Sequence, residues 1–395
     1  MFSHRTDWTA SLNKLTVERR KRSDLLDLTE TNPTRAGIGY PQDELAEIFA
    51  RAARAPYDPD PRGLRSAREA LAAAIESPLP AARGEGQGEG SFPVTPAPHP
   101  NPLPARGERG LDADEFILTA STSEAYSFIF KLLTDPGDEV ITATPSYPLL
   151  EHLAALELIT LRTFPLEFHR RWEMHGTYVK DNTRAIVVVN PNNPTGSFVT
   201  PREQDAAAAM GIPVISDEVF LDYPLDATGT TFVRDDVLTF TLGGLSKSAG
   251  LPHYKLAWIR VSGPGKREAL DALELIADNF LSVATPVQVA LPELLRIAPR
   301  IRDAIRARTR RNLDILRAAS SPHVQVLPVE GGWSVVLRVP RTMTDEELAL
   351  KILDRGVVVQ PGYFFDFATD GYIVLSLLTR EDVFAEGVRR VIESI

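Results

Sequence analysis

The chain contains 395 residues, 43% of them hydrophobic, with a formal net charge of -10 at pH 7 and an isoelectric point near 5.3. The length favours two to three domains, and the acidic net charge argues against nucleic-acid binding. The absence of cysteine excludes disulfides and thiolate metal ligands, and we assign no metal site. Because the apolar runs are too short to span a bilayer and the N-terminus lacks the apolar core of a signal peptide, we expect a cytoplasmic protein without membrane contact.

The N-terminal third changes character twice. Residues 1–45 are polar and typical of an arm with a short strand, which we assign partly to a small domain, whereas residues 64–76 place apolar side chains at helical spacing. Residues 78–110 are rich in Pro and Gly and repeat themselves, since PLPAARGEG from Pro78 is echoed by PLPARGERG from Pro102. Such a segment buries too little apolar surface to offset its ordering entropy. We expect a disordered surface insertion, with a Pro-rich docking loop as the alternative.

Strands and helices then alternate, which predicts a mostly parallel sheet covered by helices on both faces. The predicted strands are 115–119, 139–142, 183–189, 213–216, 237–242 and 254–261, and the predicted helices between them include 123–133 and 147–156. From about residue 290 the pattern becomes α+β. Its predicted helices are 291–319 and 344–354, and its predicted strands are 324–327, 333–339 and 373–377. We therefore expect a large domain over 46–290 and a C-terminal small domain over 291–395.

Polar residues gather after five of the predicted strands. They are ASTSEA after Leu118, SYP after Thr142, NPNNPTG after Val189, SDE after Ile215 and GGLSK after Leu242. Ligands of open parallel sheets bind at the carboxyl ends of the strands, so these residues are expected to share one site. Each segment alone also fits an ordinary turn or helix cap. Their order and spacing together favour a ligand site.

This combination resembles the pyridoxal-phosphate-dependent aminotransferases of fold type I, class I/II. The resemblance covers nearly the whole chain outside 78–110, from TNPT at 31–34, through YDPDPRGLRSAREALA from Tyr57, to VVVQPGYFF from Val357. It implies an α/β fold with a mostly parallel large-domain sheet, helices on both of its faces and a smaller α+β domain. It also implies pyridoxal 5'-phosphate (PLP) as the cofactor and a homodimer as the assembly.

The resemblance assigns two catalytic residues. Lys247, in SKSAG, matches the lysine that holds PLP as a Schiff base and, once freed, moves a proton between the substrate's α-carbon and the cofactor. Asp217 matches the carboxylate that pairs with the protonated pyridine nitrogen, which keeps the ring an electron sink. An ordinary surface lysine and a helix-capping aspartate are the alternatives.

The other cofactor-binding residues also come from the resemblance. Asn193 matches the donor to the ring's 3' oxygen, Tyr147 the aromatic residue that stacks on the ring, and Tyr57 the tyrosine that reaches the phosphate of the partner subunit. A helix N-terminus favours an anion, so the start of the helix after Leu118 is expected to receive the phosphate. The residues implied there are Ser121, Thr122 and Ser123.

Four positions depart from the family's pattern. Lys255 replaces an arginine expected near the phosphate, Gly244 a hydroxyl residue, and Phe220 a tyrosine that donates to the 3' oxygen. The arginine that binds the substrate carboxylate would fall at Val374 and is absent. Arg380 is the nearest cation after that strand, so we predict that Arg380 binds the carboxylate.

A solvated loop position for Arg380 is the alternative. In that case backbone amides or Asn32 would recognise the substrate, or the substrate would lack an α-carboxylate. The expected activity is transfer of an amino group from an amino acid to a 2-oxo acid. A β-lyase or decarboxylase on the same fold, and a non-catalytic module, remain as alternatives.

Overall fold

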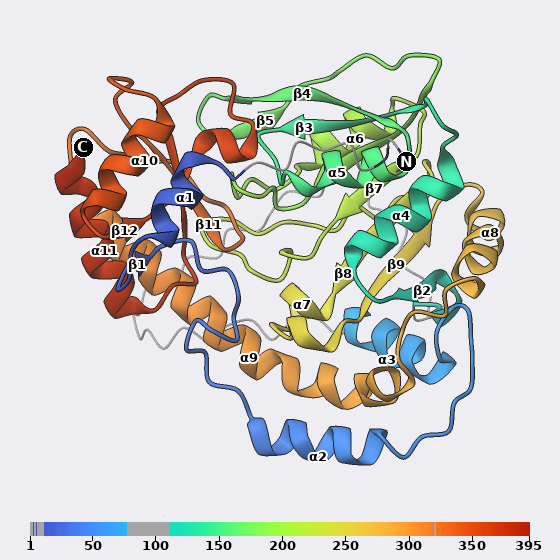
Figure 1. Cartoon of the computed structure of the whole chain (residues 1–395). Helices are drawn as coiled ribbons and strands as arrows, with labels where there is room; N and C mark the ends of the chain where they lie inside the picture. Colours follow the sequence, from blue (N-terminus) through green and yellow to red (C-terminus); the bar gives the residue numbers. More distant parts are fainter. Residues whose placement is uncertain (1–2, 4, 6–11, 77–110, 320) are drawn as a thin grey trace, which may run out of the picture.

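The computed structural model describes residues 3, 5, 12–76, 111–319 and 321–395. The predicted insertion over 78–110 therefore lies outside the described residues. Figure 1 shows a large sheet flanked by helices and a second sheet beside it, near the C-terminus. No helix in the described ranges combines the length and the apolar character needed to cross a membrane.

The eight-stranded sheet has the order β2-β9-β8-β7-β6-β3-β4-β5. Neighbouring pairs from β8 to β4 are parallel, whereas β9 and β5 run antiparallel to their neighbours, which confirms the predicted mostly parallel sheet. In the central strand β6, residues 185–189 form a continuous apolar run, as expected when helices cover both faces. The strands are β2 (Phe116–Thr119), β3 (Glu139–Thr144), β4 (Thr160–Phe168), β5 (Trp172–Met174), β6 (Thr183–Val189), β7 (Val214–Asp217), β8 (Thr239–Gly244) and β9 (Ala257–Ser262).

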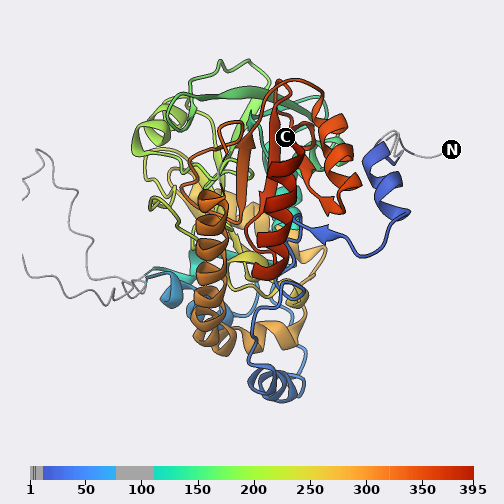
Figure 2. The same ribbon diagram turned by 90° about the vertical axis from the view of Figure 1, so that its left-hand side faces the viewer.

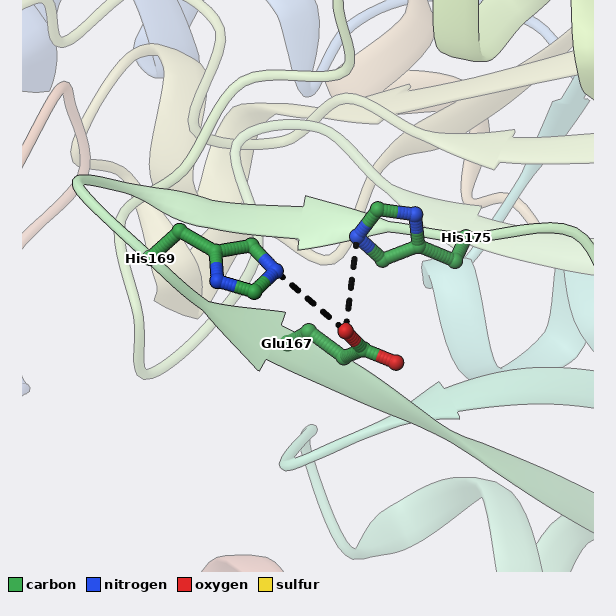
Figure 3. Close-up of side chains that lie close together, drawn as sticks. All are labelled: Glu167, His169 and His175. Carbon is green, nitrogen blue, oxygen red and sulfur yellow. Dashed lines mark ion pairs between the residues drawn. The ribbon is translucent and has the colours of Figure 1, made fainter.

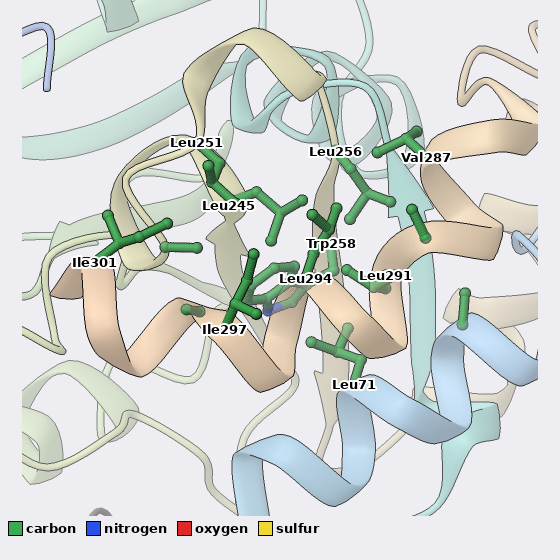
Figure 4. Packing of buried hydrophobic residues seen from close by; sticks show 14 of the residues in the cluster. Leu71, Leu245, Leu251, Leu256, Trp258, Val287, Leu291, Leu294, Ile297 and Ile301 are labelled. Carbon is green, nitrogen blue, oxygen red and sulfur yellow. The ribbon is translucent and has the colours of Figure 1, made fainter. Parts of the chain in front are cut away.

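Apolar helix faces bury both sides of this sheet. Helices α4 (Thr122–Leu133), α5 (Leu149–Leu156) and α8 (Lys266–Asp278) share one core with it. In another core, Leu71 of α3 (Arg65–Glu76) and Leu291 and Leu294 of α9 (Thr285–Ala318) surround Leu245 and Trp258 (Figure 4). Helix α6 (Pro201–Ala208) begins with a capping box formed by Thr200 and Glu203.

The second sheet is antiparallel, in the order β10-β11-β14-β13. Helix α11 (Glu381–Ser394) packs along α9, as Figure 2 also shows. Near the N-terminus, β1 (Leu26–Asp27) pairs with β12 (Val357–Val358), and α2 (Gln42–Ala52) packs on α9. The remaining elements are α1 (Lys14–Arg20), β10 (Gln325–Val326), β11 (Ser334–Arg338), α10 (Asp345–Asp354), β13 (Gln360–Pro361) and β14 (Tyr372–Ser376), and a short helix α7 (Leu245–Ser248) follows β8.

Most predicted boundaries differ from the structure by at most two residues, but two differ by three or more. The helix predicted over 291–319 begins at Thr285, and its interior contains Pro292 and Pro299. The strand predicted over 254–261 begins only at Ala257, because residues 252–254 form a 3-10 turn and Lys255 has a φ of 51°. The domain division at 290 remains a proposal, and α9 crosses it.

Candidate active site

The site lies where the carboxyl ends of the parallel strands meet. Asp217 is the last residue of β7, and Lys247 lies on α7 directly after the neighbouring strand β8. Asn193 follows β6, and Tyr147 follows β3. The strand order therefore brings segments that are distant in sequence to one edge of the sheet, as the sequence predicts.

Lys247 lies in a largely apolar, aromatic environment. Its Nζ is 5.1 Å from the centroid of the Trp333 ring and 5.8 Å from that of Phe220. The Tyr223 hydroxyl donates to the Lys247 carbonyl oxygen at 2.6 Å, which fixes the backbone at this point. Burial lowers the pKa of Lys247, and the negative charge of Asp217 opposes this shift only in part. A lowered pKa makes the neutral, nucleophilic form of the amine easier to reach.

Asp217 is a partly buried carboxylate held by two donors. Its Oδ2 accepts from the Tyr126 hydroxyl at 3.0 Å, and its Oδ1 accepts from the Val219 N–H at 3.2 Å. Burial raises the pKa of Asp217, although both hydrogen bonds and the nearby Lys247 act in the opposite direction. Among the described residues Asp217 forms no ion pair, so a cation beside it would relieve its desolvation.

The first turn of α4 is the predicted phosphate end. Ser121 caps the helix, because its Oγ accepts from the Glu124 N–H at 3.2 Å. The Glu124 carboxylate accepts from the Ala120 N–H at 2.7 Å, so this amide is already engaged. The N–H groups of Thr122 and Ser123 belong to the first turn, where backbone amides lack helical partners. Lys255 is exposed and forms no ion pair or hydrogen bond with the described part of the chain.

Asn193 and Tyr147 are the residues predicted to contact the PLP ring. The Asn193 Oδ1 accepts from the Ser334 hydroxyl at 3.2 Å, which leaves its amide N–H groups as donors. Ser334 belongs to the second sheet, so this contact joins the two sheets. Tyr147 is about half exposed, and burial together with the charge of Asp217 raises its pKa.

The predicted substrate residues already have partners. The Arg380 side chain is 60% exposed and pairs with Asp382 at 2.8 Å. The Asn32 Oδ1 accepts from the backbone N–H and the hydroxyl of Thr34. Val374 is fully buried in an apolar cluster with Trp172 and Phe367, so the position where the family carries arginine is filled by hydrocarbon.

Three site residues escaped the sequence analysis. Tyr126 contacts Asp217, Trp333 lies beside Lys247, and Tyr223 supports the Lys247 carbonyl. None belongs to a motif. Tyr126 and Trp333 come from segments distant in sequence from the residues they contact, and Tyr223 comes from a turn 24 residues before Lys247. Tyr57, by contrast, was predicted, and its side chain is 71% exposed in the single chain.

Known proteins match both the sequence and the fold. The family model for aminotransferase class I and II matches residues 108–389. The nicotianamine aminotransferase 1 of Oryza sativa subsp. japonica is 31% identical over 47% of this chain and 41% of its own length. The S-alkyl-thiohydroximate lyase of Arabidopsis thaliana is 32% identical over 48% of this chain and 44% of its own length. The matches thus span less than half of these relatives.

Solved structures match the fold over nearly the whole chain, with coverages of 95% to 100%. A structure from Escherichia coli, described as having a methionine aminotransferase function, superposes with a TM-score of 0.79 at 20% identity. The superposition covers 100% of this chain and 99% of that one. This likeness concerns the fold, whereas the family model covers most of the sequence itself. The chain therefore belongs to the aminotransferase class I and II family, whose cofactor is pyridoxal phosphate.

Proposed function

We propose that the protein is a PLP-dependent aminotransferase that moves an amino group from an amino acid to a 2-oxo acid. The observation that carries this proposal is the placement of a partly buried lysine amine and a partly buried carboxylate at adjacent strand ends. Lys247 supplies the nucleophile for an aldehyde cofactor, and Asp217 supplies the anion for a protonated pyridine.

The residues present fit PLP. Asp217 is a partly buried carboxylate without an ion-pair partner in the described chain, and a pyridinium N–H would provide one. The buried indole N–H of Trp333, beside Lys247, likewise has no hydrogen-bond partner among the described residues. A cofactor with a cationic edge and polar oxygens would satisfy groups that are costly to leave unpaired.

The chain's residues then have separate tasks. PLP supplies an electron sink that stabilises negative charge on the substrate's α-carbon. Lys247 would anchor the cofactor and, when free, would move a proton to or from that α-carbon, while Asp217 would hold a proton at the ring nitrogen. The amide of Asn193 would donate to the 3' oxygen, and Tyr147 would cover the ring. The phosphate would be held by Ser121, Thr122, Ser123 and Lys255.

The substrate carboxylate lacks the usual arginine. We propose Arg380 as its partner, in which case the Arg380 guanidinium must leave Asp382 when substrate binds. Asn32 is the alternative partner for the substrate carboxylate. It lies in the loop before Tyr40, and the Tyr40 hydroxyl donates to the carbonyl of Gly250. Gly250 is three residues after Lys247, so this loop lies near the proposed site. If Arg380 binds the carboxylate, Arg380→Ala should raise the KM for amino acids about tenfold and leave amines without a carboxylate unaffected.

Attachment of the cofactor tests the proposed function most directly. The purified protein is reduced with borohydride and digested, and the peptide that carries the cofactor is identified by mass spectrometry. We expect the label on Lys247 and no label in Lys247→Ala. A label on another lysine would refute the assignment. A screen of amino donors against a mixed pool of 2-oxo acids would then identify the substrates.

A β-lyase is the second candidate, because the arginine is missing and one matched relative is a lyase. Release of ammonia without any 2-oxo acid acceptor would favour it over transamination. We also propose that the enzyme works in the cytoplasm as a homodimer, with amino acids and 2-oxo acids as its ligands, and without nucleic acid.

A further inference from the structure

A short sequence repeat lies between Tyr147 and Asn193 but includes no residue of the proposed active site. The motif Glu-x-His occurs as Glu167-Phe-His169 and again as Glu173-Met-His175. Strands β4 and β5 pair antiparallel as a hairpin, and Glu167 lies directly opposite Glu173. Because side chains alternate along a strand, Glu167 and Glu173 share one face. His169 and His175 directly follow the ends of the two strands, and both contact Glu167.

The other face of this hairpin is apolar. It carries Leu166, Phe168, Trp172 and Met174, and Trp172 is buried against Phe367 and Tyr372. The face with the two Glu-x-His motifs is exposed instead. Two like charges directly opposite each other, Glu167 and Glu173, destabilise a strand pair unless a cation lies between or beside them.

The donor atoms of this face already converge (Figure 3). The Glu167 Oε2 is 3.3 Å from the Nε2 of His169 and 3.7 Å from the Nε2 of His175. One ligand atom from each of these three residues lies within 4.8 Å of the others. Donors bound to one tetrahedral zinc at about 2.0–2.1 Å are roughly 3.3–3.4 Å apart, so only small side-chain movements are needed.

We propose that Glu167, His169 and His175 form a binding site for a divalent transition-metal ion, with zinc as the best match. Two imidazoles and one carboxylate are ligands that suit Zn²⁺ and discriminate against Mg²⁺ and Ca²⁺. Glu173, whose Oε2 is 4.0 Å from the Nε2 of His175, is positioned to complete the coordination. Water would otherwise occupy the fourth position, because the site is open to solvent.

The site would act as a clamp across the hairpin. It joins β4, the turn after it and the residue that follows β5, while the opposite face of the same hairpin packs on the second sheet through Trp172. Sequence analysis assigned no metal ligands, because the two motifs come together only through the strand pairing.

Zinc binding is measured by competition with a chromophoric chelator, using the untagged full chain with bound PLP and no free PLP. We expect one zinc ion per chain with micromolar affinity, weakened at least tenfold by His169→Gln and by His175→Gln. The matched control is His323→Gln, which changes another exposed histidine in a turn and should leave the affinity unchanged.

Hydrogen exchange provides a second measurement that does not depend on activity. Zinc should slow amide exchange in residues 166–174 of the wild type and not in His169→Gln. Absence of binding tighter than millimolar would overturn the proposal, as would an affinity that both histidine variants leave unchanged. Equal binding of Mg²⁺ would also overturn it, because this ligand set does not favour Mg²⁺.

Discussion

The charge of the Asp217 carboxylate and its hydrogen bonds are expected to affect different properties, namely the reaction rate and the retention of PLP. Asp217→Asn keeps the size of the side chain and can still accept from Tyr126, but it cannot balance a protonated ring nitrogen. We expect the variant to retain PLP and to lose at least a hundredfold in the rate of half-transamination, equivalent to about 2.7 kcal/mol. Single-turnover absorbance measures this rate. A near wild-type rate would mean that the ring proton is not needed.

Phe220 leaves Asn193 as the only predicted donor to the 3' oxygen. The Phe220 ring packs edge-on against Trp333, with centroids 5.2 Å apart. Phe220→Tyr should restore a second donor and tighten PLP binding several-fold. Asn193→Ala should then weaken PLP binding less in the Phe220→Tyr background than in the wild type. Equal losses in both backgrounds, measured by PLP dissociation, would show that the two positions act independently.

Glu218 makes stability depend on pH. Burial raises its pKa to about 7, against opposing hydrogen bonds from Thr231, Phe232 and Ser216. Because the folded-state pKa lies above the ordinary 4.5, the contribution of Glu218 to stability is complete below pH 4.5 and is lost as pH rises through 7. Glu218→Gln cannot ionise. The wild type loses stability between pH 4.5 and pH 7, whereas the variant does not. The free energy of unfolding of Glu218→Gln minus that of the wild type should therefore rise over this range, by at most about 3 kcal/mol.

Urea unfolding at both ends of this pH range measures the effect. The change in the difference between the two proteins is the quantity of interest, because glutamine also alters the hydrogen bonds. A difference that stays constant with pH would mean that Glu218 does not change its protonation state there.

Among the elements, α3 and the segment that begins at Leu111 meet closely. The Leu111 N–H donates to the carboxylate of Glu76, the last residue of α3. Residues 79–109 can therefore be replaced by a short Gly/Ser linker without separating their flanks. Loop-closure entropy changes by only about 0.6 kcal/mol per doubling of length, so we expect unchanged folding and PLP content. Circular dichroism and PLP absorbance check this, and insoluble protein would contradict it.

Local pattern predicted some elements well and missed others for physical reasons. The strand over residues 183–189 matches β6 because a run of buried β-branched residues leaves few alternatives. Strands β4 and β5 were missed, because their pattern mixes exposed and buried positions. Helix α9 was predicted too short, since prolines usually mark helix ends but are accommodated inside this long, well-packed helix.

At the scale of the whole molecule, Tyr57 is exposed in the single chain and is therefore free to contact a second copy. This supports the proposal that Tyr57 reaches the PLP phosphate of the partner subunit in a dimer. Tyr57→Phe should leave the dimer intact by native mass spectrometry and weaken PLP binding about tenfold, because only the bond to the partner's phosphate is lost. Tyr178→Phe is the matched control, since Tyr178 is also largely exposed, at 63%. A monomeric wild type, or equal PLP affinity in both variants, would contradict the proposed assembly.

The sequence predicted the site better where strand order alone brings residues together. Lys247 and Asp217 follow neighbouring strands, so their proximity follows from topology. Tyr126 and Asp217 are 91 residues apart, and their contact depends on how α4 packs on the sheet. Trp333 reaches Lys247 from the second sheet, whose placement no local pattern specifies.

The pairing of β1 with β12 has a consequence for synthesis on the ribosome. Leu26 lies beside Val357, and the Arg22 guanidinium donates to the Leu353 carbonyl, 331 residues further along the chain. A chain made from its N-terminus onward must therefore carry this first strand without its partner until almost all of the protein has emerged. The loop with Asn32 follows that strand directly. We expect the substrate side of the pocket to assemble last, so nascent chains that stop before residue 357 should be inactive even if their large sheet has formed.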